Sequence, residues 1–346
     1  MIGRPDSCVR RTRKALFRKP AHQSGMALIM VLLSMALVVM MTAGMTRHQS
    51  VRVFKAGHYL AQTQGYSVAL GVEAFAQQIL VRDFESDREA NEYVDSPDEV
   101  WARYAAVLPL DDGGVAEVQV DDLSGRINLN DLVTPAGQVN TQTRERLMRL
   151  LMALEITEVH VDALIDWIDP DEETISAYGA EDGQYLMANP PYRAANQPFV
   201  SVSELRLIEG MTEDYYRLLR PHVAALPVSG TGINVNMATA QVLRSLHMEL
   251  TDAQVVAVIE RRTEQRFLNV QDFLASPEFA GLGLRPDGLR LNSMFFEVVS
   301  RVTWDERVVD LVSTVYRSQQ GEVSTVSRDS GQKNRITKEP FAVTEG

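Results

Sequence analysis

The chain has 346 residues, of which 45% are hydrophobic and 23% are charged, and its net charge is −12 at pH 7. Cys8 is the only cysteine, which excludes a fold braced by internal disulfides. The acidic excess disfavours phosphate-rich partners such as nucleic acids and anionic headgroups.

The first residues differ sharply from the rest. Met1 to Gly25 carry a charge of +6, which leaves −18 for the remainder. Met26 to Met45 are uncharged and mostly apolar, and as a helix they span about 30 Å, the thickness of a bilayer core. The positive-inside rule then predicts a cytoplasmic N-terminus and a body on the other side. An ordinary secretory signal has a shorter apolar core, and the small residues of its cleavage site follow that core, whereas here the small residue, Gly25, precedes it. A signal anchor that is not cleaved remains the alternative.

Apolar residues at helical spacing continue beyond this span, with no proline before Pro97. They predict one very long helix to about Asp83, apolar all round at first and amphipathic later. A short helical piece is expected from Val100 to Val107. The alternation from Val115 to Asp122 then predicts a half-buried strand.

Helical patterns dominate from Asn140 to Arg290. Two alternating runs from Phe295 to Arg317 predict a β-hairpin, and the polar residues after it predict a disordered tail. Because strands need partners, we expect an α+β fold: a long N-terminal helix packed on a small antiparallel sheet, with a large all-α domain inserted. The expected parts are a basic leader (1–25), a transmembrane part (26–46), a helix and strand (47–130), the inserted α domain (131–290), the hairpin (291–317) and the tail (318–346).

A weak internal echo lies in the helical block. "INLN" at 127–130 and "INVN" at 233–236 each lead into an apolar helix. The second resembles the helix-hairpin-helix module of DNA-binding proteins, which binds phosphate through a glycine-containing hairpin. The corresponding hairpin here is "HMEL", with Glu249 and no glycine. A helical pair kept for packing is therefore favoured, and a membrane-anchored DNA-binding protein is the alternative function.

The stretch "DWIDPDEETISAYGAEDGQYL", 166–186, concentrates acidic residues in a predicted loop. Asp166 and Asp169 lie one helical turn apart, and Asp171 follows just past the helix end at Pro170. So many carboxylates repel one another unless a cation neutralises them, and an oxygen-rich loop suits calcium. The EF-hand pattern is missing, and spacing alone favours a solvated loop over a metal site.

Patterns typical of enzymes are also missing from the sequence. There is no Gly-x-Ser-x-Gly, His-Glu-x-x-His or P-loop motif, and His160, His222 and His247 are scattered along the chain. We therefore predict that the protein is not an enzyme and has no catalytic residues.

The basic leader, Gly25 and the following "MALI" resemble the signal of type IV pilins and pseudopilins. A prepilin peptidase cuts such a signal, here between Gly25 and Met26, and the new N-terminal amine is then methylated. Together with "GRINLND", "DWIDPDE", "GAEDGQY", "INVN" and the helical insertion, this signal makes the chain similar to the type II secretion system protein K family. The resemblance covers roughly Gly25 to Tyr316.

The resemblance implies a non-enzymatic minor pseudopilin, anchored in the inner membrane by a single span, with its body in the periplasm. It implies a position at the tip of the pseudopilus, initiating or capping its assembly for export of folded proteins, in a complex with minor pseudopilins I and J. It also implies structural calcium in the α domain. The expected ligands are Asp169, Asp171, Glu173, Glu181 and Asp182.

One position departs from the usual pilin pattern. Most pilins and pseudopilins carry a glutamate at the fifth mature residue, which is thought to pair with a neighbour's N-terminal amine, whereas here that residue is Met30. A carboxylate in hydrocarbon is costly unless a partner neutralises it, so its absence removes both the cost and the pairing. Together with the bulky insertion, this predicts a unique tip position and few copies.

Overall fold

The computed structural model describes residues 24–111, 113–304 and 307–342. Most of the predicted leader, the turn of the predicted hairpin and the last four residues lie outside the described residues. The chain divides into two compact units, one up to Ala61 and one from Gln62 onward.

Helix α1 runs from Ser24 to Ala90 and is apolar and exposed in its N-terminal part. It is one helix whose length and composition suffice to cross a membrane. The prediction of a single long helix is confirmed, and it extends beyond the expected end at Asp83. Asn91 follows with a φ of 55°, a left-handed residue of the kind that closes helices.

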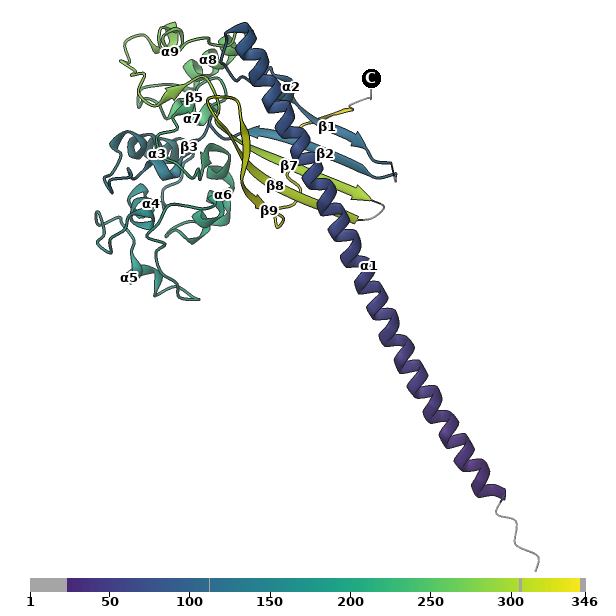
Figure 1. Ribbon diagram of the computed structural model, residues 1–346. Helices are drawn as coiled ribbons and strands as arrows, with labels where there is room; N and C mark the ends of the chain where they lie inside the picture. Colours follow the sequence, from purple (N-terminus) through teal and green to yellow (C-terminus); the bar gives the residue numbers. More distant parts are fainter. Residues whose placement is uncertain (1–23, 112, 305–306, 343–346) are drawn as a thin grey trace, which may run out of the picture. The chain divides into compact units, whose positions relative to one another are not determined.

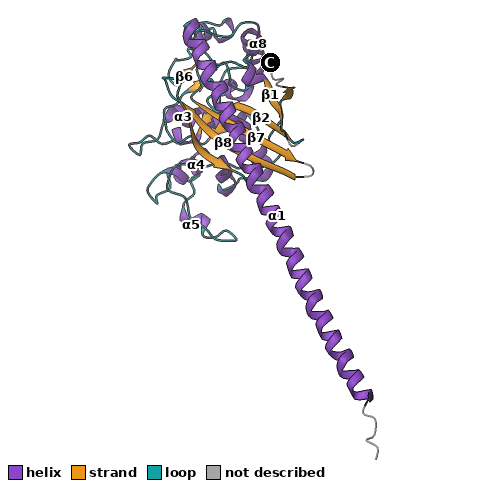
Figure 2. Cartoon of the chain, turned by 45° about the vertical axis from the view of Figure 1, so that its right-hand side comes forward, coloured by secondary structure: helices purple, strands orange, loops and turns teal. Residues whose placement is uncertain are grey.

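In the described part of the second unit, six strands form a sheet in the order β10-β1-β2-β7-β8-β9. The strands are β1 (Tyr104–Pro109), β2 (Val115–Asp122), β7 (Phe295–Trp304), β8 (Arg307–Arg317), β9 (Val323–Asp329) and β10 (Glu339–Ala342). All pairs are antiparallel except β1 with β10. Figures 1 and 2 show the later part of α1 crossing one face of this sheet, where Ala69, Ala76 and Leu80 share a core with Val118 and Phe296.

The predicted helical piece from Val100 to Val107 is wrong in its second half. Helix α2 covers only Val100–Arg103, and β1 begins at Tyr104. β1 pairs with β2 in antiparallel register, Ala106 opposite Val118. Tertiary pairing therefore overrides the local helical preference of this short segment.

The predicted disorder of residues 318–346 is wrong where the structure describes them, because this segment supplies both edge strands of the sheet. β9 is held mainly by polar contacts, although Val323 at its start packs against the core of the sheet. Glu73 on α1 is 2% exposed and accepts hydrogen bonds from Thr325 Oγ1 (2.7 Å) and Arg328 Nη2 (2.8 Å). Burial alone would raise the pKa of Glu73, but hydrogen bonds from Arg328, Ser313 and Thr325 lower it. The polar composition of residues 323–329 therefore does not indicate disorder, because buried polar contacts order them as a strand.

The insertion is the part of the chain that follows β2 and precedes β7, and it has a hydrophobic core of its own. Figure 1 shows its helices gathered to one side of the sheet. Its elements are β3 (Ile127–Asn128), η1 (Leu129–Asp131), α3 (Thr141–Ala153), α4 (Val161–Ile168), α5 (Asp182–Tyr185), η2 (Val202–Leu207), α6 (Glu213–Leu219), η3 (Arg220–His222), β4 (Val223–Ala224), β5 (Ile233–Asn234), α7 (Ala240–Arg244), α8 (Asp252–Glu264), α9 (Val270–Leu274), η4 (Pro277–Phe279) and β6 (Leu289–Arg290). Ile127 and Leu129 belong to this core, so the insertion begins before the expected residue 131.

The sequence echo corresponds to a repeated local structure. The first "IN" pairs in parallel with Val223 and Ala224, and the second pairs in parallel with Leu289 and Arg290. In each motif the second asparagine makes a two-way hydrogen bond with a distant backbone: Asn130 with Phe199, and Asn236 with Phe267. Each repeat therefore closes a module of the insertion on itself.

Candidate metal centre

The acidic stretch is organised by the end of helix α4. Asp166 lies in its last turn and is fully buried, with Oδ1 accepting a hydrogen bond from the Ile175 N–H (3.0 Å) and Oδ2 left without a partner. Gly179 packs directly on this carboxylate, since a Cβ there would lie 2.0 Å from Asp166 Oδ2. The loop can therefore close over Asp166 only with glycine at position 179.

Three of the predicted ligands converge here. Asp169, Asp171 and Glu181 each offer a carboxylate oxygen, and these oxygens lie within 4.8 Å of one another. Asp169 caps the C-terminus of α4, and Glu181 precedes α5. Glu181 is 4% exposed; neither of its carboxylate oxygens makes a hydrogen bond of full geometry, and the nearby Asp182 N–H only partly offsets their burial.

The protonation of this group reflects its crowding. Burial raises the pKa of Asp169 to about 6, and the neighbouring Asp171 and Asp166 charges add to the effect. Burial likewise raises the pKa of Glu181 to about 7, with Asp166 and Asp169 contributing. Buried like charges without a cation disfavour ionisation, so the site has the electrostatic character that a bound cation would relieve.

Two predicted ligands lie outside the converging group. Asp182 pairs with Arg193 at 2.5 Å and accepts the Ala194 N–H at 3.0 Å. Glu173 is exposed, and its backbone N–H donates to Asp171 Oδ1 at 2.9 Å. Either side chain would have to move to reach the group.

Two oxygens that sequence reasoning did not choose as ligands belong to this region. Asp166 carries a buried unpartnered Oδ2, and Asn196 carries a buried unpartnered Oδ1 while its Nδ2 donates to the Asp171 carbonyl at 3.0 Å. The position of Asp166 one turn before Asp169 was a usable signal. No sequence pattern points to Asn196, which reaches the loop only through the fold.

The residues present fit a calcium ion. Asp166, Asp169, Glu181 and Asn196 together hold five buried oxygens that lack hydrogen-bond donors. A buried acceptor without a donor costs stability, and the great majority of such atoms in folded proteins are satisfied. Carboxylate and amide oxygens without nitrogen or sulfur are the donor set that calcium prefers.

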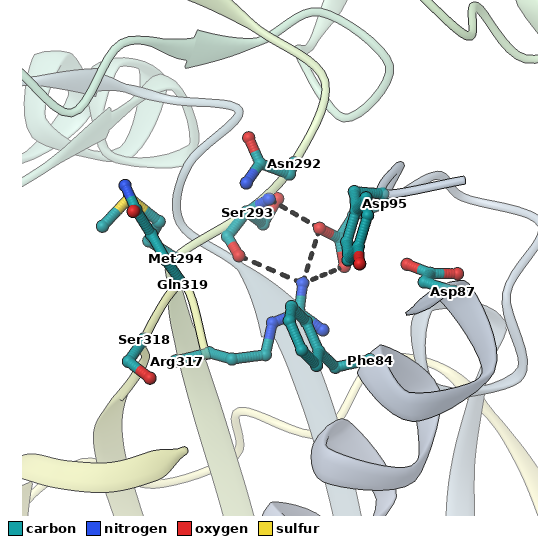
Figure 3. A pocket seen from close by; sticks show the side chains of 10 residues that line it. Phe84, Asp87, Asp95, Asn292, Ser293, Met294, Arg317, Ser318 and Gln319 are labelled. Carbon is teal, nitrogen blue, oxygen red and sulfur yellow. Dashed lines mark hydrogen bonds and ion pairs between the residues drawn. The ribbon is translucent and has the colours of Figure 1, made fainter. Parts of the chain in front are cut away.

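A second acidic group lies where α1, the segment before α2 and the β7–β8 pair meet. Asp83, Asp95 and Glu99 also offer oxygens within 4.8 Å of one another. Here the protein supplies the cation: Arg317 Nη2 lies 2.5 and 2.6 Å from the two Asp95 oxygens, and Nη1 lies 3.1 Å from Asp83 Oδ2. Figure 3 shows the Arg317 side chain reaching Asp95 beside Phe84.

The protonation of the second group is also perturbed. Burial raises the pKa of Glu99 to about 9 and that of Asp83 to about 6, with neighbouring carboxylates contributing. Arg317 opposes the rise at Asp83. The adjoining cavity has a volume of about 260 Å³ and includes Asp87, whose pKa burial raises to about 7.

The predicted processing position lies in the first unit. Gly25 and Met26 are exposed at the start of α1, and no atom lies within 4 Å of the place where a Gly25 Cβ would stand. The bond between them is therefore not shielded by side chains of the described residues.

Comparisons with known proteins identify the family. Two family models described as type II secretion system (T2SS), protein K match residues 125–228 and 233–292, which correspond to the two modules of the insertion. Type II secretion system protein K of Pseudomonas aeruginosa is 37% identical over 90% of this chain and 93% of its own length. The protein of the same name from Aeromonas hydrophila is 34% identical over 62% of this chain and 67% of its own.

A solved structure agrees with this assignment. A chain of the GspK-GspI-GspJ complex from enterotoxigenic Escherichia coli is 26% identical, with a TM-score of 0.67, over 78% of this chain and 98% of that chain. The expected α+β fold with a helical insertion on a pseudopilin frame is thereby confirmed. The chain belongs to the type II secretion system protein K family, whose members are non-enzymatic minor pseudopilins.

Proposed function

We propose that this protein initiates or caps the pseudopilus of the type II secretion system, at its tip and in complex with minor pseudopilins I and J. The observation that carries the proposal is the helical insertion, whose core is separate from that of the sheet. A solved chain from a GspK-GspI-GspJ complex matches this architecture along 98% of its length. Relatives named as secretion proteins give no support to the alternative of DNA binding.

The insertion and Met30 favour a tip position over a repeated one. An added domain between β2 and β7 would have to be accommodated at every step of a closely packed helical fibre. Met30 cannot neutralise a neighbour's terminal amine as a carboxylate would. Labelling the full chain and imaging assembled pseudopili should find it at one end and in few copies. A distribution along the fibre would refute this role.

We also propose an inner-membrane anchor formed by residues 26–46, with the N-terminus in the cytoplasm and the body in the periplasm. The exposed apolar start of α1 and the +6 charge before it support this orientation. Prepilin peptidase would cut between Gly25 and Met26. Mass spectrometry should find a methylated Met26 N-terminus, and Gly25→Leu should leave the precursor uncut, whereas Gly44→Leu in the same helix should be processed normally.

Calcium is proposed as a structural ion of the insertion. Asp166, Asp169, Asp171, Glu181 and the Asn196 amide oxygen would hold it, and bound calcium would neutralise the repulsion among the carboxylates. Glu173 and Asp182 were expected as ligands on the family resemblance, and they would join only after rearrangement. Isothermal titration of chelator-treated protein should detect binding, and the Asp169→Asn/Glu181→Gln variant should abolish it.

A further inference from the structure

A cleft of about 540 Å³ lies between the insertion and the β8–β9 edge of the sheet. The segment 200–206 and part of 216–225 form one wall, and residues of β8, β9 and 331–335 form the other. It is lined by six basic side chains: Arg126, Arg206, Arg220, Arg328, Lys333 and Arg335. Such a concentration is unexpected in a chain whose charge after residue 25 is −18.

Three of the six basic side chains form ion pairs with carboxylates of the chain. Arg206 pairs with Glu213 at 2.8 Å, and Arg328 pairs with the buried Glu73 at 2.8 Å. Arg335 pairs with Glu297, one of the two carboxylates that line the cleft. These pairs leave other basic residues of the cleft without a carboxylate.

Arg126, Arg220 and Lys333 form no ion pair within 4.0 Å with a carboxylate of the described residues, and Arg220 donates only a long hydrogen bond to Gln332 Oε1, at 3.5 Å. Asp329, the other lining carboxylate, accepts hydrogen bonds from the Gly331 N–H and Gln332 Nε2 of its own turn. Burial raises the pKa of Glu297, and the nearby Arg126 and Arg220 oppose the rise. Glu297 therefore already interacts with three guanidinium groups and cannot neutralise them all.

Besides the basic side chains, the two walls of the cleft carry hydroxyl groups and apolar side chains, which a peptide can contact. Ser201 and Ser203 on the insertion and Thr314 on β8 add hydroxyl groups, and Val200 and Val312 add apolar surface. Arginine forks bind carboxylates in bidentate fashion, and hydroxyl groups can donate to them as well. The cleft thus combines unneutralised cations with donors and apolar contacts along two facing walls.

We propose that this cleft binds an acidic segment of a partner protein. Charge complementarity selects the occupant, because closely spaced Asp and Glu side chains would meet Arg126, Arg220 and Lys333, which form no ion pair with the described residues of the chain. A long polyanion such as nucleic acid would also meet the strongly acidic remainder of the body, which disfavours it. This binding role goes beyond assembly at the tip and does not depend on it.

The test measures fluorescence anisotropy of a labelled peptide of alternating Glu and Ser residues, titrated with the full chain in detergent micelles at low salt. The cleft variant is Arg126→Glu/Lys333→Glu. The matched control is Arg88→Glu/Arg285→Glu, which makes the same change in net charge at exposed residues outside the cleft. Thermal unfolding verifies that both variants fold, and the single variant Lys333→Glu at an exposed position serves if the double variant does not.

We expect the cleft variant to lose about tenfold or more in affinity and the control to lose about threefold or less, with binding weakened by salt. Equal losses in both variants would show a general charge effect and overturn the proposal. Unchanged binding by the cleft variant would do the same. Tighter cleft-dependent binding of duplex DNA or of anionic vesicles would assign the cleft to another class of ligand.

Discussion

The two acidic groups of the second unit solve the same electrostatic problem differently. Each brings three carboxylate oxygens within 4.8 Å of one another and includes a buried acid. At Asp95 the chain provides its own cation, Arg317, whose side chain is 4% exposed. At Asp169, Asp171 and Glu181, no basic side chain of the described residues pairs with the carboxylates.

The first group is therefore neutralised by the chain itself, whereas neutralisation of the second depends on a bound cation. Arg317 joins β8 to α1 and to the segment before α2, and it also donates to the Ser293 carbonyl at 3.1 Å. That connection needs no ligand. The loop after α4 leaves buried oxygens without donors, so its stability depends on what the solution supplies.

The largest effect is expected when the built-in cation is removed. Arg317→Met should lower the free energy of unfolding by about 3–5 kcal/mol, because it leaves the buried Asp95 charge unpaired. Arg206→Met, which breaks the half-exposed pair with Glu213 and removes the guanidinium from the Tyr216 ring, should cost much less. Urea unfolding measures both. Adding Asp95→Asn to Arg317→Met should restore part of the loss, and no such rescue would mean that the charge of Asp95 is not the cause.

Calcium should have the next largest effect, confined to the other group. At a hundred times its dissociation constant, calcium should add about 2.7 kcal/mol to the stability of the chelator-treated protein. Asp169→Asn/Glu181→Gln should remove this gain, and Glu172→Gln in the same loop should keep it. Thermal unfolding with and without calcium gives the comparison. Arg317→Met, if folded, should retain the full calcium gain, and loss of that gain would show that the two groups are not independent.

The closure of the loop over Asp166 can be tested at one atom. Gly179→Ala should cost about 2 kcal/mol and weaken calcium binding, because its Cβ would overlap Asp166 Oδ2. Gly183→Ala, where no atom lies within 4 Å of the new Cβ, should be neutral or slightly stabilising in α5. Denaturant unfolding and calcium titration measure the two variants. Equal effects of the two alanines would contradict the packing explanation.

The smallest expected effect is on pH dependence. The folded pKa values of Asp169 (about 6) and Glu181 (about 7) are raised, so without calcium the folded state holds protons that the unfolded chain has already lost. Stability should therefore fall as pH rises from about 4 to about 7.

Comparison with Asp169→Asn/Glu181→Gln isolates this contribution, because Asp87 and Glu99 titrate in both proteins. After allowance for solvent screening, the change in unfolding free energy between about pH 4 and about pH 7 should differ between the two proteins by less than about 1 kcal/mol. With calcium present the trend should reverse, since protons compete with the ion. Unfolding curves at several pH values test this, and identical pH profiles for the two proteins would argue against the raised pKa values.

Parts of the candidate site could be predicted because they lie close together in the sequence. Asp166 in the last turn of α4, Asp169 at its C-cap and Asp171 just after Pro170 lie within six residues of one another. The choice between Asp169 and Asp182 could not be predicted. Arg193 and the Ala194 N–H satisfy Asp182 from a segment with no sequence signal, and Asn196 reaches the loop in the same way.

The sequence by itself determined the long helix, its apolar first half, the strands β2, β7 and β8, and the helical insertion, because periodicity and uncharged length act locally. Only the tertiary structure decided where β9 and β10 pair. β9 is mostly polar and exposed, and β10 has only four residues, so neither strand carries a core pattern. Glu73, buried on α1, orders β9 through Thr325 and Arg328. Tertiary packing also decided which acidic group has its own cation. Arg317 and Asp95 are far apart in the chain, and the fold alone brings their charges together.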